Sequence, residues 1–109
     1  METHPESRNE KWSNEKWIEL IRVRSSETRL RAALPTLETQ VRDIEAAAEG
    51  AETHFLRHAL YDGDLAVVVI WRNTREPRAS REGLLVAESL KRLGSVDHAV
   101  WVPTERTDA

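Results

Sequence analysis

The sequence predicts an α+β fold in which a four-stranded antiparallel sheet carries two helices on one face. Two observations predict it. Two segments with apolar residues at helical spacing and four strand-like runs follow one another in the order β-α-β-β-α-β, and a turn signal joins the middle two strands. This order gives the split-βαβ, or ferredoxin-like, arrangement with sheet order 4-1-3-2. At 109 residues the chain has room for one core and no second domain.

The predicted domain covers residues 16–104, and polar segments flank it. Residues 1–15 contain one large apolar group, Trp12, within unpatterned polar sequence. We expect a flexible leader there, or an arm that docks on a partner surface. Residues 105–109 form a polar tail.

The first half of the domain predicts a strand followed by a long helix. Residues 17–25 are rich in β-branched and aromatic side chains, which is typical of a strand. Ser26 is the expected N-cap of a helix whose apolar stripe runs through residues 30–48 at spacings of three and four. Pro35 predicts a kink or a short 3₁₀ break, and the helix should end near Gly50.

The second half predicts a hairpin, a helix and a closing strand. Strands at 52–60 and 65–72 are joined by an Asp-Gly turn, which is a strong hairpin signal. Ser80 is the expected N-cap of the helix at 80–94, and Gly94 should supply a left-handed residue at its end. The last strand, 95–103, stops at Pro103.

Apolar side chains occupy both faces of the strand at 65–72. One face would carry Leu65, Val67, Val69 and Trp71, and the other Ala66, Val68 and Ile70. Two helices cover only one face, and exposure of the other apolar face to water would be unfavourable. We therefore expect a homodimer in which two sheets pack face to face and form a barrel-like core.

Composition excludes several classes of protein. No apolar run approaches the about 18 residues that a membrane helix needs, and the N-terminus has no apolar signal region. Because the chain contains no cysteine, disulfides, thiol catalysis and thiolate metal sites are excluded. The net charge is -3 and the arginines alternate with glutamates, which argues against nucleic acid as a partner. We expect a cytoplasmic protein with no membrane partner.

The segments resemble the dimeric α/β-barrel superfamily, and within it the antibiotic-biosynthesis-monooxygenase-like proteins. The resemblance covers residues 17–103 and is carried by AVVVIW, which ends at Trp71, and by EGLLVAESLKRLGSVDHAVW, which ends at Trp101. It implies small homodimers with a pocket between sheet and helices. It also implies oxidation of aromatic or quinol substrates by oxygen without a cofactor, or a small dimer that has no catalytic activity.

A second branch of this superfamily degrades haem. It uses an asparagine on the first strand, a tryptophan at the end of the third and a histidine on the second helix. Trp71 matches the tryptophan, but residues 17–25 contain no asparagine and residues 73–96 no histidine. The resemblance therefore disfavours haem degradation.

The predicted hairpin register brings two histidines to the face of Trp71. A two-residue turn at Asp62 and Gly63 would pair His58 with Val67 and His54 with Trp71. Either histidine could be the general base that removes a phenolic proton, and Trp71 could line the substrate pocket. The alternative is that the histidines and the indole only pack or lie at the sheet edge.

Other polar side chains have competing interpretations. Arg22 and Arg57 could clamp an anionic substrate, or could pair with Glu19 and Glu52. The arginines of residues 73–82 could bind a carboxylate or simply be solvated; they are Arg75, Arg78 and Arg81.

The histidines also raise the possibility of a metal site. His54 and His58 would need a third ligand, and His98 could supply it only across a dimer, because it lies on the opposite edge strand. Alternation places His98 and Trp101 on opposite faces of the last strand, so the two cannot form one site. We therefore expect the chemistry around Trp71 and His54.

Overall fold

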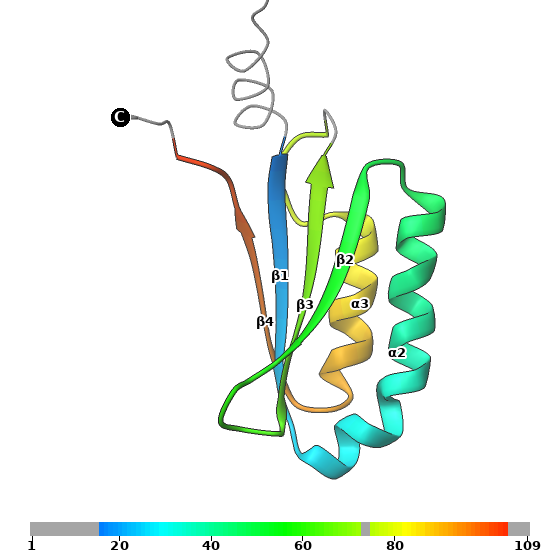
Figure 1. Ribbon diagram of the computed structural model, residues 1–109, viewed down its shortest axis with the longest axis vertical. Helices are drawn as coiled ribbons and strands as arrows, with labels where there is room; N and C mark the ends of the chain where they lie inside the picture. The colour runs from blue at the N-terminus through cyan, green and yellow to red at the C-terminus, as the bar shows by residue number, and fades with distance from the viewer. Residues whose placement is uncertain (1–15, 73–74, 105–109) are drawn as a thin grey trace, which may run out of the picture.

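The computed structural model describes residues 16–72 and 75–104, and it confirms the predicted order of elements. Figure 1 shows the strands as one layer with both helices on the same side of it. The elements are β1 (Lys16–Arg24), α2 (Glu27–Ala47), β2 (Ala51–Arg57), β3 (Asp64–Arg72), α3 (Arg81–Lys91) and β4 (Ser95–Trp101). The predicted leader with Trp12 and the predicted tail lie outside the described residues.

The sheet has the strand order β2-β3-β1-β4, and every neighbouring pair is antiparallel. This is the predicted order 4-1-3-2 read from the other edge. β1 lies in the middle with β3 on one side and β4 on the other, while β2 and β4 are the two edges. Side chains of β1 therefore have neighbours on two strands and on the helix layer, which makes β1 the natural place for a buried site.

The hydrophobic core fills the space between the helices and one face of the sheet. On β3 the predicted alternation is confirmed, because Leu65, Val67, Val69 and Trp71 are buried. Among the described residues, the buried apolar side chains are those of Trp17, Ile21, Val23, Leu30, Leu37, Val41, Ile44, Ala48, Leu65, Val67, Val69, Trp71, Val86, Ala87 and Leu90.

Both predicted N-caps are confirmed. The hydroxyl of Ser26 accepts the backbone N–H of Arg29, and that of Ser80 accepts the backbone N–H of Gly83. Helix α2 runs unbroken past Pro35, so no 3₁₀ break occurs, although Figure 1 shows its first turns lying at an angle to the rest. Among the described residues no helix is long and apolar enough to cross a membrane.

The predicted register of the β2–β3 hairpin is wrong. In the structure Ala51 faces Trp71, and His54 faces Val68. The pairing is shifted by three residues, and an odd shift moves every side chain of β2 to the opposite face. His54 therefore lies on the face away from the helices, whereas Trp71 points toward them.

The cause of the shift is a longer loop whose turn is bound elsewhere. Asp62 and Gly63 do occupy the centre of a turn, closed by the N–H of Asp64 on the carbonyl of Tyr61 at 3.1 Å. However, the carbonyl of Gly63 accepts the N–H of Ser25 at 2.7 Å, at the junction of β1 and α2. A Cβ atom on Gly63 would lie 2.5 Å from the carbonyl oxygen of Ser25. This packing holds the turn away from the position that a two-residue hairpin would give it.

Gly94 has a different role from the predicted one. Gly50 is the described glycine with a positive φ, at 85°, so Gly94 does not adopt the left-handed conformation. Instead its backbone lies against β1, and a Cβ atom there would come within 2.0 Å of the carbonyl oxygen of Arg24. Close approach of two backbones, rather than backbone conformation, requires glycine at this position.

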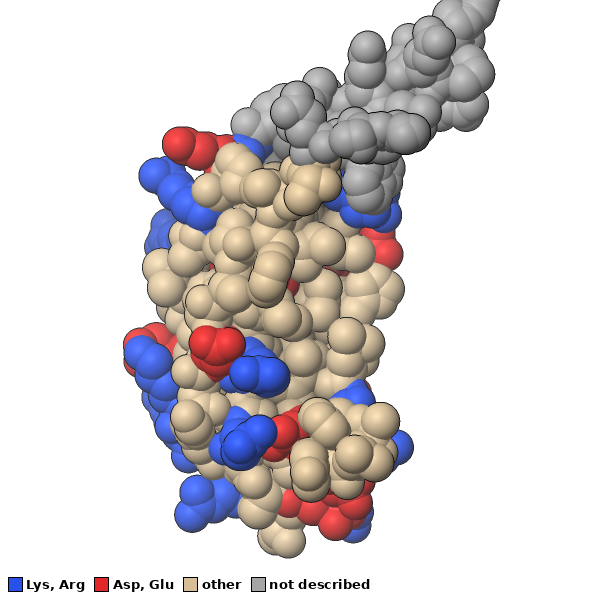
Figure 2. Space-filling view, turned by 90° about the vertical axis from the view of Figure 1, so that its left-hand side faces the viewer, with Lys and Arg blue, Asp and Glu red and all other residues tan. Residues whose placement is uncertain are grey.

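No described element covers the face of the sheet away from the helices, and the middle of this face carries apolar side chains from β1 and β3. Figure 2 views the molecule from the β4 side and shows a broad uncharged surface in its upper half, with charged groups mainly below it and at its margins. Ile18, Leu20, Val68 and Ile70 point to this face and are partly exposed. Trp101, also on this face, is 59% exposed.

The role of Gly94 can be tested with two substitutions. Gly94→Ala and Gly94→Asn should both lower the free energy of unfolding by about 1–3 kcal/mol, because any Cβ collides with backbone atoms. A left-handed position would tolerate asparagine, so a stable Gly94→Asn protein in urea denaturation would contradict the close approach. Ser95→Ala, at an exposed neighbouring position, should stay within about 0.5 kcal/mol of the unsubstituted protein.

Candidate functional site

A carboxylate lies at the centre of the core. Glu19 is in the middle of β1, has 0% exposure, and faces the helices in the same row as Trp17 and Ile21. Its neighbours across the sheet are Val69 on β3 and Val100 on β4. A charged group in such apolar surroundings is strongly unfavourable unless hydrogen bonds compensate it.

Four donors converge on the Glu19 carboxylate. Oε1 accepts the Trp71 indole N–H at 2.8 Å and the Ser80 hydroxyl at 2.6 Å. Oε2 accepts the Ser80 backbone N–H at 2.9 Å and lies 2.8 Å from His98 Nε2. The donors come from β3, from the residue before α3 and from β4. One side chain therefore connects the sheet to the start of a helix, and its two oxygens are fully used.

The N-terminus of α3 is built against this carboxylate. Ser80 donates its hydroxyl to Glu19 and accepts the Gly83 N–H with the same oxygen at 2.8 Å. A Cβ atom on Gly83 would lie 2.2 Å from Glu19 Oε2, so only glycine lets the helix approach this closely. The positive end of the helix dipole also favours a negative charge there. The Ser80 hydroxyl thus donates to one partner and accepts from another, which fixes its orientation.

In the described part of the chain, His98 is the titratable partner of Glu19 that reaches the surface. Its side chain is 13% exposed, whereas that of Glu19 is fully buried. Since Nε2 donates to the carboxylate, the remaining proton-accepting atom is Nδ1. No other hydrogen bond of His98 is found within residues 16–72 and 75–104. A carboxylate that fixes the tautomer of a partly exposed imidazole is an arrangement suited to proton transfer.

Two tryptophans and an arginine are stacked beside the carboxylate. The rings of Trp17 and Trp71 are stacked with centroids 5.6 Å apart, and the Arg75 guanidinium lies 4.4 Å from the centroid of Trp71. Arg75 also makes two hydrogen bonds to Glu82, at 2.9 and 3.1 Å. These bonds hold the pKa of the Glu82 carboxyl below its usual range and raise the pKa of Arg75.

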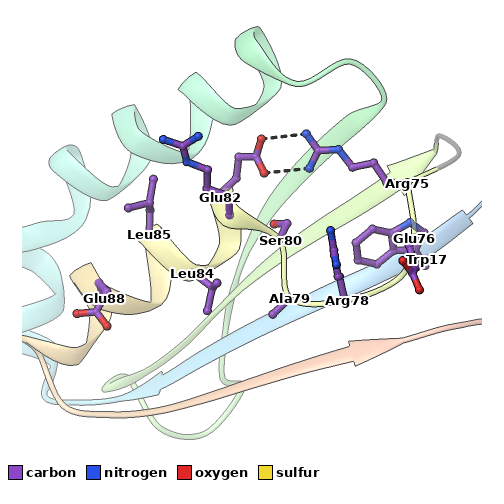
Figure 3. A pocket seen from close by; sticks show the side chains of 11 residues that line it. Trp17, Arg75, Glu76, Arg78, Ala79, Ser80, Glu82, Leu84, Leu85 and Glu88 are labelled. Atoms are coloured by element: carbon purple, nitrogen blue, oxygen red, sulfur yellow. Dashed lines mark hydrogen bonds and ion pairs between the residues drawn. The ribbon is translucent and has the colours of Figure 1, made fainter.

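An open groove of about 860 Å³ adjoins this cluster. Figure 3 shows residues from β1, from the segment before α3 and from α3 itself around it. Trp17 and Ser80 belong both to the groove wall and to the surroundings of Glu19, whereas Trp71 is completely buried. The groove is lined by Trp17, Arg75, Glu76, Arg78, Ala79, Ser80, Arg81, Glu82, Leu84, Leu85 and Glu88.

The two histidines predicted as bases do not lie beside Trp71. His54 is on the opposite face, where its Nε2 lies 2.7 Å from Glu52, which also binds Arg72. These hydrogen bonds lower the pKa of Glu52. His58 lies in the β2–β3 loop, and its Nδ1 accepts the backbone N–H groups of Leu60 and Tyr61 at 2.9 and 3.2 Å.

The two arginines predicted as a clamp are also separated from Trp71. Arg22 points to the open face and pairs with Asp97 at 3.6 Å, not with Glu19. Arg57 lines a smaller groove of about 260 Å³ near α2. Across the described ranges, no three His, Asp or Glu side chains gather into a metal site.

Sequence reasoning missed Glu19 and His98 as a pair. The signal was present, since Glu19 alternates with Trp17 and Ile21 on a face that must be buried. His98 stands between Val96 and Val100 and was correctly separated from Trp101. What alternation cannot give is that β4 and the start of α3 bring their donors to the same carboxylate.

The network around Glu19 should be intolerant of a neutral replacement. Glu19→Gln places an amide nitrogen, itself a donor, against existing donors, so we expect a loss of about 3 kcal/mol or more in the free energy of unfolding. Urea denaturation measures it. Glu88→Gln is the matched control, because Glu88 is exposed and pairs only with Lys91 in the described residues, and it should cost under about 1 kcal/mol. Equal stability of the two variants would contradict the network.

Comparisons with known proteins identify the fold. No protein-family model and no curated protein matches the chain. A mutant of SnoaB, a cofactor-independent oxygenase from Streptomyces nogalater, matches with a TM-score of 0.56 and 14% identity over 85% of this chain and 96% of the other.

Two further solved structures match in the same way. A Nitrosomonas europaea protein assigned to the antibiotic biosynthesis monooxygenases has a TM-score of 0.62 at 7% identity, over 87% of this chain and 96% of the other. A conserved protein from Methanosarcina mazei has 0.63 at 8% identity, over 84% and 96%. The chain thus has the ferredoxin-like α+β fold of the antibiotic-biosynthesis-monooxygenase-like proteins, as its sequence predicted.

Proposed function

We propose that the chain is a cofactor-independent, monooxygenase-like protein that oxidises a small aromatic or quinol substrate, with His98 as the base. The observation that carries this proposal is the Glu19–His98 pair, in which a buried carboxylate directs Nε2 and leaves Nδ1 to accept a proton. We propose that the substrate enters through the groove lined by Trp17 and Ser80, because Ser80 and His98 bind the same oxygen of Glu19. His98 does not line the groove itself, so the phenol must reach past Ser80 toward the His98 side of the carboxylate.

The proposed reaction begins with proton transfer. His98 Nδ1 takes the phenolic proton, and the resulting phenolate is electron-rich enough to reduce oxygen directly. One oxygen atom forms a new bond to a ring carbon, which loses its hydrogen, and the other atom leaves as water, so that phenol and O₂ give quinone and H₂O. Glu19 acts through His98 by fixing its tautomer and orientation, and is therefore a positioning residue.

We further propose that the functional unit is a homodimer joined through the open faces of the sheets. Support comes from the partly exposed side chains of Ile18, Leu20, Val68 and Ile70, which no described element covers, and from the exposed indole of Trp101. Burial of a continuous apolar sheet face is a strong driving force for association. His54 or His58 is the alternative base in this proposal, although neither lies in the helix-facing core with Trp71.

A second function is supported by a different observation. Trp71 and Glu19 are completely enclosed, and the hydrogen-bonding capacity of the carboxylate is satisfied by the chain itself. Such a network also fits a dimer that binds a small molecule in the groove without transforming it. The alternative function is therefore a non-catalytic ligand-binding dimer.

Oxygen consumption with 1,5-dihydroxynaphthalene tests the proposed reaction, since monooxygenation yields a coloured quinone and consumes one O₂ per product. His98→Gln keeps an N–H for Glu19 and removes the basic nitrogen, so the initial rate should fall about 100-fold or more. His54→Ala and His58→Ala are the controls and should retain the rate. If the rate is retained in His98→Gln and lost in one of the controls, the histidine replaced in that control is the base. Binding without any oxygen uptake would favour the ligand-binding dimer.

Light scattering tests the dimer. Val68→Asp places a charge in the middle of the open sheet face and should give a monomer at micromolar concentration. Leu60→Asp introduces the same charge in the β2–β3 loop, where the side chain is 77% exposed, and should leave the dimer unchanged. If the unsubstituted protein is a monomer at micromolar concentration, the proposed face-to-face dimer is refuted.

A further inference from the structure

We infer that the groove beside α3 binds an aromatic carboxylate, with Arg78 facing the anionic group and the indole N–H of Trp17 supplying a second donor. This inference rests on the proposed function for the choice of groove, and it deepens that function by naming the class of substrate. A volume of about 860 Å³ is within the range of small-molecule sites.

The charges in the groove leave an excess of arginine. Three arginines and three glutamates line it, but Arg75 is bound by Glu82, and Glu88 pairs with Lys91 at 3.1 Å. That leaves Arg78 and Arg81 against Glu76. Neither arginine makes an ion pair within residues 16–72 and 75–104. The lining as a whole is therefore neutral, but its side chains outside ion pairs carry one more positive than negative charge, on a chain whose net charge is -3.

Trp17 provides an observation that is independent of the charges. This residue is 2% exposed and lines the groove, yet its Nε1 has no hydrogen-bond partner in the described part of the chain. A buried N–H without an acceptor is unfavourable and rare in folded proteins. The other indole of the stack, Trp71, has its N–H satisfied by Glu19. Because Nε1 is itself enclosed, an acceptor atom of a ligand would complete the hydrogen bonding of Trp17 only after the groove wall shifts to admit it.

The shape of the groove selects an aromatic acid over a simple anion. Figure 3 shows Arg78 standing between Ser80 and Trp17, while Leu84 projects from α3 farther along. Leu84 is 51% exposed and Leu85 56%, so the helix presents apolar surface that a ring can cover. A planar carboxylate matches the fork of a guanidinium, and its attached ring matches the apolar wall.

The experiment compares two ligands of the same shape, one with a carboxylate and one with the neutral amide in its place. The full-length protein is titrated calorimetrically with 6-hydroxy-2-naphthoate and with the neutral 6-hydroxy-2-naphthamide. We expect the acid to bind about tenfold more tightly, as one charge-assisted contact allows. Equal affinity for the two compounds, or binding of neither, would overturn the inference.

Matched variants locate the anionic contact. Arg78→Gln should abolish the preference for the acid while leaving the affinity for the amide unchanged. Arg42→Gln removes an equivalent charge from the exposed face of α2 and should preserve the preference. If Arg42→Gln lowered the affinity for the acid as much as Arg78→Gln, the preference would reflect overall charge and the site would be refuted. Trp17→Phe keeps the ring and removes the N–H, and it should weaken both ligands several-fold.

The titration separates this inference from the proposed function. If the preference for the acid depends on Arg78 but the protein consumes no oxygen with dihydroxynaphthalene, the carboxylate site is supported and the proposed oxidation is refuted. If oxygen uptake depends on His98 but the protein binds acid and amide equally, the oxidation is supported and the carboxylate site is refuted.

Discussion

The buried carboxylate of Glu19 is the interaction on which the rest of the molecule depends. An ionised group in the core of a small domain is stable only while donors surround it, and removing any one donor leaves a desolvated polar atom behind. Its donors come from β3, β4 and the residue that begins α3. One carboxylate thus sets the orientation of the Trp71 ring, the position of the start of α3 and the orientation of His98 on the edge strand β4.

The sequence was sufficient for the fold because the fold depends mainly on local patterns. The apolar stripe of α2, the alternation on β3 and the serines at the helix starts are each contained within a few residues, and all were found as predicted. The face of β2 could not be predicted, since the turn after it binds Ser25 through Gly63 rather than closing the hairpin tightly.

The candidate site could be predicted only in part for a similar reason. Trp71 and Ser80 were singled out, the first as a pocket residue and the second as a cap, but nothing local connects them. The donors of Glu19 lie 52, 61 and 79 residues away along the chain. A glutamate in phase with buried residues is a detectable signal of a polar centre, whereas its partners require the three-dimensional arrangement.

The fold is shared with proteins at 7–14% identity, which shows how little of the site the architecture itself specifies. The charges of the groove and the hydrogen bonds of Glu19 come from the side chains of this chain, not from the shared backbone fold. Neither the asparagine nor the histidine of the haem-degrading branch is present in the corresponding segments. In this chain the side chains of the candidate site project from β1, β3, β4 and the start of α3.

The contact between Gly63 and Ser25 also has a kinetic consequence. A hairpin with a tight turn can form early, by itself, because its pairing is local. Here the turn that joins β2 and β3 is held by the junction of β1 and α2, about forty residues earlier in the chain. The correct face of β2 is therefore chosen only once β1 is in place, so we expect β2 to join the sheet late in folding, after β1 and β3 have paired.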